Sequence, residues 1–146
     1  PPAPARPTAA AMLAAEELLR ERLAERLTIL RMGGLVGPGR EAGRFLAGKK
    51  AIPHPERRVN LVHLDDCLGA VRAVLESQAW GQTFNVVAPG HPTRKAFYTR
   101  QALQAGLEPP EFLPPTSEGP AGKVVSSEKL QQLPGFAFQK PDPMNW

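Results

Sequence analysis

The sequence has little of what holds small secreted domains or membrane proteins together. Its single cysteine, Cys67, cannot form an intrachain disulfide, and a lone thiol fits a reducing cytoplasm. No run of about 18 apolar residues is present, which is the length that a membrane-spanning helix needs. The start also lacks the basic-then-apolar order of a secretory signal. We therefore expect a cytoplasmic protein with no membrane partner.

Residues that usually carry acid–base or metal chemistry are also scarce. The single tyrosine is Tyr98, and no lysine precedes Lys49. His54 and His91 lie in proline-containing loops without a second ligand nearby, so we expect no metal site. Cys67 lies at the start of an apolar helix, where burial favours inert packing over reactivity.

The charge balance is mildly basic, with 18 lysines and arginines against 14 acids and a net charge of +4. The basic residues are spread along the chain, and adjacent ones such as Lys49 and Lys50 have no aromatic residues between them. Nucleic-acid binding usually combines a basic stripe with aromatic stacking platforms. We therefore expect no nucleic-acid partner, although a basic nucleic-acid or protein interaction domain remains an alternative.

The pattern of apolar residues predicts alternating helices and strands. We expect strands at 28–30, 59–64 and 83–87, helices at 9–26, 40–46, 65–77, 94–105 and 127–133, and a short edge strand at 111–113. This order is typical of an α/β layer structure with a parallel sheet. With 146 residues the chain can bury one core, but these few short strands are too few for a complete doubly wound domain.

The stretch 28–40 organises the chain, because an apolar strand leads there into a glycine-rich corner. Gly33, Gly34, Gly37 and Gly39 follow the strand, and Pro38 interrupts them. A dinucleotide-binding turn needs Gly-x-x-Gly-x-x-Gly between a strand and a helix. The spacing does not match, so this corner is not the phosphate loop. It is either a plain turn or a backbone surface that a ligand can approach closely.

An ordered set of short motifs resembles the second half of the NAD-dependent epimerase/dehydratase family, the extended or atypical short-chain dehydrogenases. The motifs are Leu30-Arg31, Gly37-Pro38-Gly39, Val62-His63-Leu64-Asp65-Asp66, Phe84-Asn85-Val86 and the tail segments 124–130 and 141–143. The resemblance implies that residues 1–146 form the second half of a Rossmann-like doubly wound sheet plus a small C-terminal mixed α/β substrate region. It also implies NAD or NADP in the complete protein, a missing N-terminal half or companion chain that binds it, and a homodimer.

The resemblance also places a catalytic pair on the first helix, where the family has a tyrosine four residues before a lysine. Aligning this helix with the family puts Thr8 at the tyrosine position and Met12 at the lysine position. Neither side chain can transfer a proton at neutral pH. We therefore assign no catalytic residue, and two functions stay open: an oxidoreductase whose dyad is lost, or a non-catalytic NAD(P)-binding sensor or scaffold.

The site residues follow from the corner and the next strand. The resemblance implies cofactor contacts from Gly33, Gly34 and Leu35. Candidate contacts to a small-molecule substrate are Arg40, Asn60 and His63. Each has a structural alternative: Arg40 can be a solvated surface arginine, Asn60 can bond backbone, and His63 can be a core histidine.

Further expectations concern charge pairing and substrate class. Arg31 ends a buried strand, so we expect it to pair with Asp65 or Asp66, which otherwise cap the following helix. The alternative partner for Arg31 is a bound substrate. Sugar-nucleotide members of the family usually carry an arginine and an asparagine where this chain has Val59 and Gly34. A nucleotide sugar is therefore not the expected substrate.

Overall fold

Two short parallel strand pairs form the centre of the computed structural model, which describes residues 7–115 and 122–146. Strand β1 (Ile29–Met32) pairs with β4 (Thr83–Val86), and β2 (Gly34–Val36) pairs with β3 (Leu61–His63). Only Gly33 separates β1 from β2 along the chain. The α/β fold class with parallel strands is confirmed.

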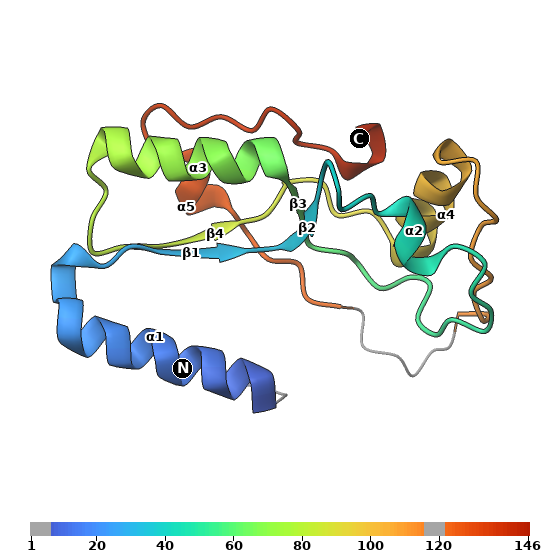
Figure 1. Cartoon of the computed structure of the whole chain (residues 1–146), viewed down its shortest axis with the longest axis horizontal. Coiled ribbons are helices and arrows are strands. Elements are labelled where there is room, and N and C mark those ends of the chain that lie inside the picture. Colours follow the sequence, from blue (N-terminus) through green and yellow to red (C-terminus); the bar gives the residue numbers. More distant parts are fainter. Residues whose placement is uncertain (1–6, 116–121) are drawn as a thin grey trace.

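Helices lie on both faces of the β1–β4 pair (Figure 1). Helix α1 (Pro7–Leu23), continued by the 3-10 turn η1 (Ala24–Arg26), lies on one face, and α3 (Leu64–Ser77) lies on the other. Buried side chains of α3 pack with β4 in one core cluster that includes Val74 and Phe84. Helix α1 buries none of its residues.

A second core cluster lies beyond the β2–β3 pair, at the end of the molecule where α2 and α4 lie (Figure 1). The one-turn helix α2 (Gly43–Leu46) packs against α4 (Arg94–Gln104), and the C-terminal 3-10 turn η2 (Pro143–Asn145) also contacts α4. Phe97 is fully buried at the centre of this cluster.

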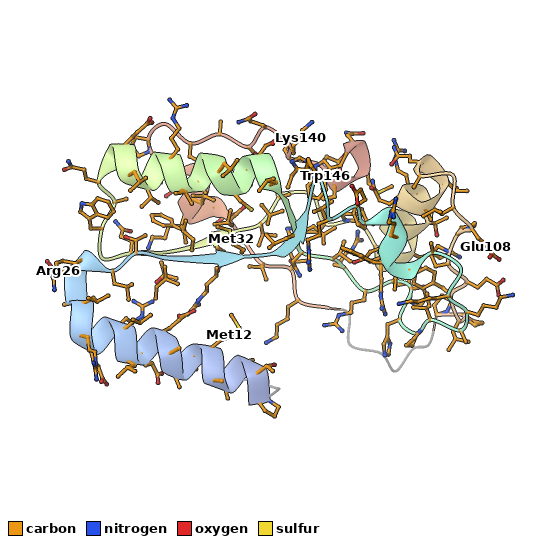
Figure 2. All side chains as sticks on the ribbon, in the orientation of Figure 1. Met12, Arg26, Met32, Glu108, Lys140 and Trp146 are labelled. Atoms are coloured by element: carbon orange, nitrogen blue, oxygen red, sulfur yellow. The ribbon has the colours of Figure 1, made fainter. Side chains whose placement is uncertain are left out.

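The C-terminal segment packs against β4 and α3. Helix α5 (Glu128–Gln131) packs on β4 and inserts Leu130 into the first core cluster. The chain then runs along α3, where Phe136 approaches Gly69. Figure 2 shows the end of this segment, with Lys140 and Trp146 near the N-terminal end of α3.

Three sequence predictions are corrected in detail. The strand expected to be buried on both faces leaves Arg31 and Met32 exposed, because β1 pairs with β4 on one edge only. The glycine corner continues as strand β2, since Gly34 bonds to the chain beside it. The predicted edge strand at 111–113 is reduced to an isolated bridge between Phe112 and Ile52.

The helix caps were predicted with mixed success. Thr93 caps α4 as expected, because its hydroxyl accepts the amide of Ala96 at 3.1 Å. The cap of α3 was predicted wrongly: it is His63, whose ring accepts the amide of Asp65. Across the described ranges 7–115 and 122–146, no helix has the length and apolarity to cross a membrane.

Candidate functional site

The β2–β3 pair brings most of the predicted site residues together at the carboxyl end of β1. The amide of Gly34 donates to the Asn60 carbonyl at 2.8 Å, and Val36 is paired with His63. The predicted residues on or directly beside this pair are Gly33, Gly34, Leu35, Asn60 and His63. Ligands of open α/β folds bind at this end of parallel strands, so the location suits a binding site.

Gly33 and Gly34 pack so closely against β3 and the residue before it that neither position has room for a side chain. A Cβ on Gly33 would lie 2.9 Å from the Asn60 carbonyl oxygen, and a Cβ on Gly34 would lie 2.8 Å from a methyl group of Leu61. The glycines therefore let the two strands approach each other. Their contact with a cofactor stays a prediction, whereas their role in strand packing is a feature of the fold.

Arg40 holds the corner closed from its far end. Its backbone amide donates to the Gly37 carbonyl at 2.9 Å, and its side-chain Nε donates to the Leu35 carbonyl at 3.0 Å. The guanidinium also lies over the ring of Phe45, 5.5 Å from its centroid, within cation–π range. Arg40 remains exposed, so it can meet an anion while it braces the backbone of Leu35.

A small hollow of about 170 Å³ lies between this corner and the start of α3. Leu35, Pro38, Arg40 and Leu64 are among its lining residues. Ligand pockets usually measure about 300–1,000 Å³. The hollow therefore has room for one end of a dinucleotide or for a small substrate, and not for a whole dinucleotide.

Asn60 ties β3 to the C-terminal segment with both ends of its amide. Its Nδ2 donates to the Lys123 carbonyl at 2.7 Å, and its Oδ1 accepts the Val125 amide at 2.8 Å. The structure thus shows Asn60 bonded to backbone groups, which was the structural alternative for this residue. A substrate contact from Asn60 stays a prediction and would compete with these bonds.

His63 is held by the start of α3 and by the C-terminal residue. Its Nδ1 lies 3.2 Å from the Asp65 amide and 3.2 Å from Asp65 Oδ2. Its ring meets Trp146 edge-on at a centroid distance of 5.6 Å. When the amide donates, Nδ1 carries the lone pair and Nε2 carries the proton. The ring is therefore positioned by structure, and its contact with substrate stays a prediction.

The two dyad positions lie one turn apart on α1, on the other side of the sheet from α3. Thr8 is exposed, and Met12 is 70% exposed. The single tyrosine cannot replace them, because Tyr98 packs against Phe97 in the second core cluster and burial raises its pKa. The structure thus offers no proton-transfer pair at this place on α1.

Arg31 does not pair with Asp65 or Asp66, and this prediction was wrong. It forms a two-pronged pair with Glu16 of α1, with Nε–Oε1 and NH2–Oε2 distances of 2.9 and 2.6 Å. The hydrogen bond from Arg31 lowers the pKa of Glu16, and Glu16 in turn raises that of Arg31. The helical periodicity of α1, which directs Glu16 toward the strand that follows, was the available signal.

Asp66 has a structural role that the sequence did not predict. Its side chain is fully buried, and its two carboxylate oxygens accept the backbone amides of Gln139 and Lys140 at 2.7 and 3.2 Å. It therefore anchors the C-terminal segment to α3. Its neighbour Cys67 is also buried, and this burial raises the pKa of the thiol, as inert packing predicts. No cluster of three metal-ligating side chains occurs among the described residues.

The fold is a Rossmann-like α/β fold of the kind found in NAD-dependent epimerases and dehydratases. A conserved protein of unknown function from Silicibacter pomeroyi superimposes with a TM-score of 0.82 at 18% identity, over 99% of this chain and 55% of that protein. UDP-glucuronic acid 4-epimerase from Bacillus cereus, solved with UDP-glucuronic acid and NAD, superimposes with a TM-score of 0.75 at 16% identity, over 99% and 52% of the two chains. At such identity the likeness concerns the fold alone.

In sequence, the chain is similar to the protein YeeZ of Escherichia coli K12. The two are 47% identical over 116 residues, which are 80% of this chain and 42% of YeeZ. The chain thus spans less than half the length of this curated relative. No protein-family model matches the sequence.

Proposed function

We propose that this chain is the substrate-side part of an NAD(P)-dependent oxidoreductase of the epimerase/dehydratase type, acting on a small molecule. The observation that carries the proposal is the convergence of Gly34, Leu35 and His63 at the carboxyl end of parallel strands. A fold shared with an epimerase solved with NAD supports it. In this proposal the corner forms the wall at the nicotinamide end of a dinucleotide whose phosphates are held elsewhere.

The residues of the corner suit that limited role. The hollow beside Leu35 and Leu64 is mostly apolar, and its small volume fits one ring of a cofactor. Arg40 stands at its mouth with an exposed guanidinium that can face an anionic group. When bound, NAD or NADP would supply hydride transfer. The chain would orient the ring, keep water away from it and hold the substrate.

Whether turnover follows depends on a proton donor that α1 does not provide. Thr8 and Met12 favour the second candidate function, a sensor or scaffold that binds NAD(P) without chemistry. The corner serves both functions equally, because binding geometry and proton transfer are separate requirements.

A chimera tests the binding proposal. The 116 matched residues of E. coli YeeZ are replaced by those of this chain, and NADH or NADPH is titrated while nicotinamide fluorescence is recorded. We expect saturable binding of at least one cofactor. No binding of either at millimolar concentration would contradict both the enzyme and the sensor.

A variant in the hollow ties that binding to the corner. Leu35 is 43% exposed, so Leu35→Glu should leave the fold intact while it places a carboxylate beside the bound ring. We expect the dissociation constant to rise about tenfold, which is equivalent to a loss of about 1.4 kcal/mol in binding free energy. Leu103→Glu on α4, where the side chain is 60% exposed, is the matched control and should bind like the parent chimera.

Cofactor oxidation with a panel of small carbonyl substrates then separates the two functions. A substrate-dependent rate supports the oxidoreductase, and saturable binding without any rate supports the sensor or scaffold. Binding of nucleic acid in place of either cofactor would favour the third candidate, a basic interaction domain.

A further inference from the structure

Strand β1 has an outer edge with unused backbone groups. The amides of Ile29 and Gly33 donate to Gln82 and Val86 on the β4 side. Since successive residues of a strand point their backbone groups to opposite edges, the amides of Leu30 and Met32 point away from β4. No described strand pairs with β1 on that edge. Open edges of this kind readily pair with another chain.

An apolar groove runs along β1 on the face of the sheet that α1 covers. It lies between α1 and β1, has a volume of about 620 Å³, and includes Met12 and Leu13 on one side and Ile29 and Met32 on the other. Figure 2 shows Met12 on the helix and Met32 on the strand across this space. The ion pair between Glu16 and Arg31 bridges it. Helix α1 is thus attached to the sheet while its apolar side chains stay largely uncovered.

Helix α3 carries a second uncovered apolar surface on the opposite face of the sheet. Four side chains along one flank are exposed by 42–62%: Leu64, Leu68, Val71 and Leu75. Their spacing of four, three and four residues places them in one stripe along the helix. A stripe of this kind on a monomer usually marks an interaction surface.

The stripe lies on the flank of α3 that looks away from the C-terminal segment. Asp66 and Gly69 lie on the other flank, where they contact residues 136–140. That segment and α5 lie beside β4, because α5 packs on β4. The stripe therefore overhangs the β1 side of the sheet. The open edge, the groove and the stripe are thus parts of one continuous surface.

We propose that this surface is an interface for an α/β segment that adds a parallel strand to β1 and lays an amphipathic helix against the stripe of α3. The occupant is the part of a YeeZ-length polypeptide that the 116 matched residues leave uncovered. A parallel sheet of this kind is normally extended by further strands with helices on both faces. The structural neighbours are nearly twice as long as this chain. This inference extends the proposed function by naming its partner, and it requires no cofactor.

Association with the remainder of E. coli YeeZ tests the interface. That remainder and this chain are co-expressed as two polypeptides and purified through a tag on the chain, and the dissociation constant is then measured by calorimetry. We expect a one-to-one complex. Leu68→Lys with Leu75→Lys should weaken it at least tenfold, because both charges would be buried in the interface. Leu103→Lys on α4 with Leu107→Lys just after that helix adds equal charge on exposed positions and should have no effect.

Each other outcome overturns the inference. These outcomes are no association, a homodimer of the chain that uses the same surface, or equal binding by both double variants. If the remainder is insoluble alone, the chimera gives the same test: the α3 pair should lower its melting temperature by several degrees while leaving that of the isolated chain unchanged. A complex that forms but binds no NAD(P) would sink the proposed function and leave the interface standing.

Discussion

The two ends of the molecule differ in how completely they are closed. Around α4, Phe97 is fully buried and meets the rings of Tyr98 and Trp146 edge-on, with α2, β2 and β3 packed about it. Around α1, no side chain of the helix is buried, and Met12 and Leu18 are 70% and 50% exposed. The end around α4 has a packed hydrophobic core. At the end around α1, the apolar side chains of the helix are not buried in any core.

The difference shows that burial here depends on what lies next to each element more than on its apolar content. Helix α1 contains Met12, Leu13, Leu18, Leu19 and Leu23, while α4 contains only Phe97, Tyr98 and Leu103 as large apolar or aromatic residues. The richer helix is the one left exposed. We interpret this as an interface, and the predictions below probe the contrast from the largest effect to the smallest.

Removing the ring at the closed end should cost most. Phe97→Ala should lower the free energy of unfolding by about 3–5 kcal/mol, because it leaves a cavity among rings that cannot collapse fully. Urea unfolding followed by tryptophan fluorescence measures this loss. The neighbouring exposed change Leu103→Ala should stay within about 0.5 kcal/mol of the parent. Equal effects would show that this end is not a packed core.

The anchor of the C-terminal segment should rank second. Asp66→Ala removes the acceptor for the amides of Gln139 and Lys140 and should cost about 1–3 kcal/mol. Limited proteolysis should also cut the segment 136–140 faster. Asp65→Ala, at a side chain that is 44% exposed, is the matched control and should change stability less. A protected segment in the Asp66 variant would contradict the anchoring role.

The ion pair at the open end should contribute little and only above acidic pH. Because Arg31 lowers the pKa of Glu16 below its ordinary value of about 4.5, the pair stabilises the fold above that pH and is lost as pH falls through the lowered pKa. Glu16→Gln should cost about 0.5 kcal/mol or less at pH 7, since the arginine is 43% exposed. The difference should shrink and then vanish as the pH falls through the lowered pKa of Glu16. An undiminished difference there would refute the pairing.

Cys67 should have the smallest effect on stability and a clear effect on reactivity. Burial raises the pKa of its thiol, so little thiolate is present at pH 7. Iodoacetamide should modify the native chain far more slowly than the chain in urea. Rapid native labelling would show that the start of α3 opens.

Sequence reasoning predicted the elements that depend on local signals. The α4 cap at Thr93, the helical pattern of α3 and the strands that became β1, β3 and β4 were all visible as periodicity or capping residues. Strand β2 was missed, because Gly34 reads as a turn residue when its partner strand is unknown. Its identity follows from pairing with β3, which lies far away in the sequence.

The residues of the candidate site were named before their contacts were known, and their role in binding stays a prediction. The family resemblance pointed to Leu35 and the strand pattern to Asn60 and His63, and the fold brings these residues to one strand pair. The sequence could not show that both ends of the Asn60 amide are bonded to residues 123–125. Side-chain partners across such separations depend on tertiary packing, which no local pattern records. The burial expected for β1 failed for the same reason, since it requires a neighbour that the described chain does not supply.

Amide hydrogen exchange along β1 tests the central contrast most directly. In the isolated chain, the amides of Leu30 and Met32 should exchange rapidly, whereas those of Ile29 and Gly33, bonded on the β4 side, should be protected. Adding the remainder of E. coli YeeZ should slow exchange at Leu30 and Met32 to the level of their neighbours. Unchanged exchange at these two amides in a formed complex would contradict strand addition at the open edge.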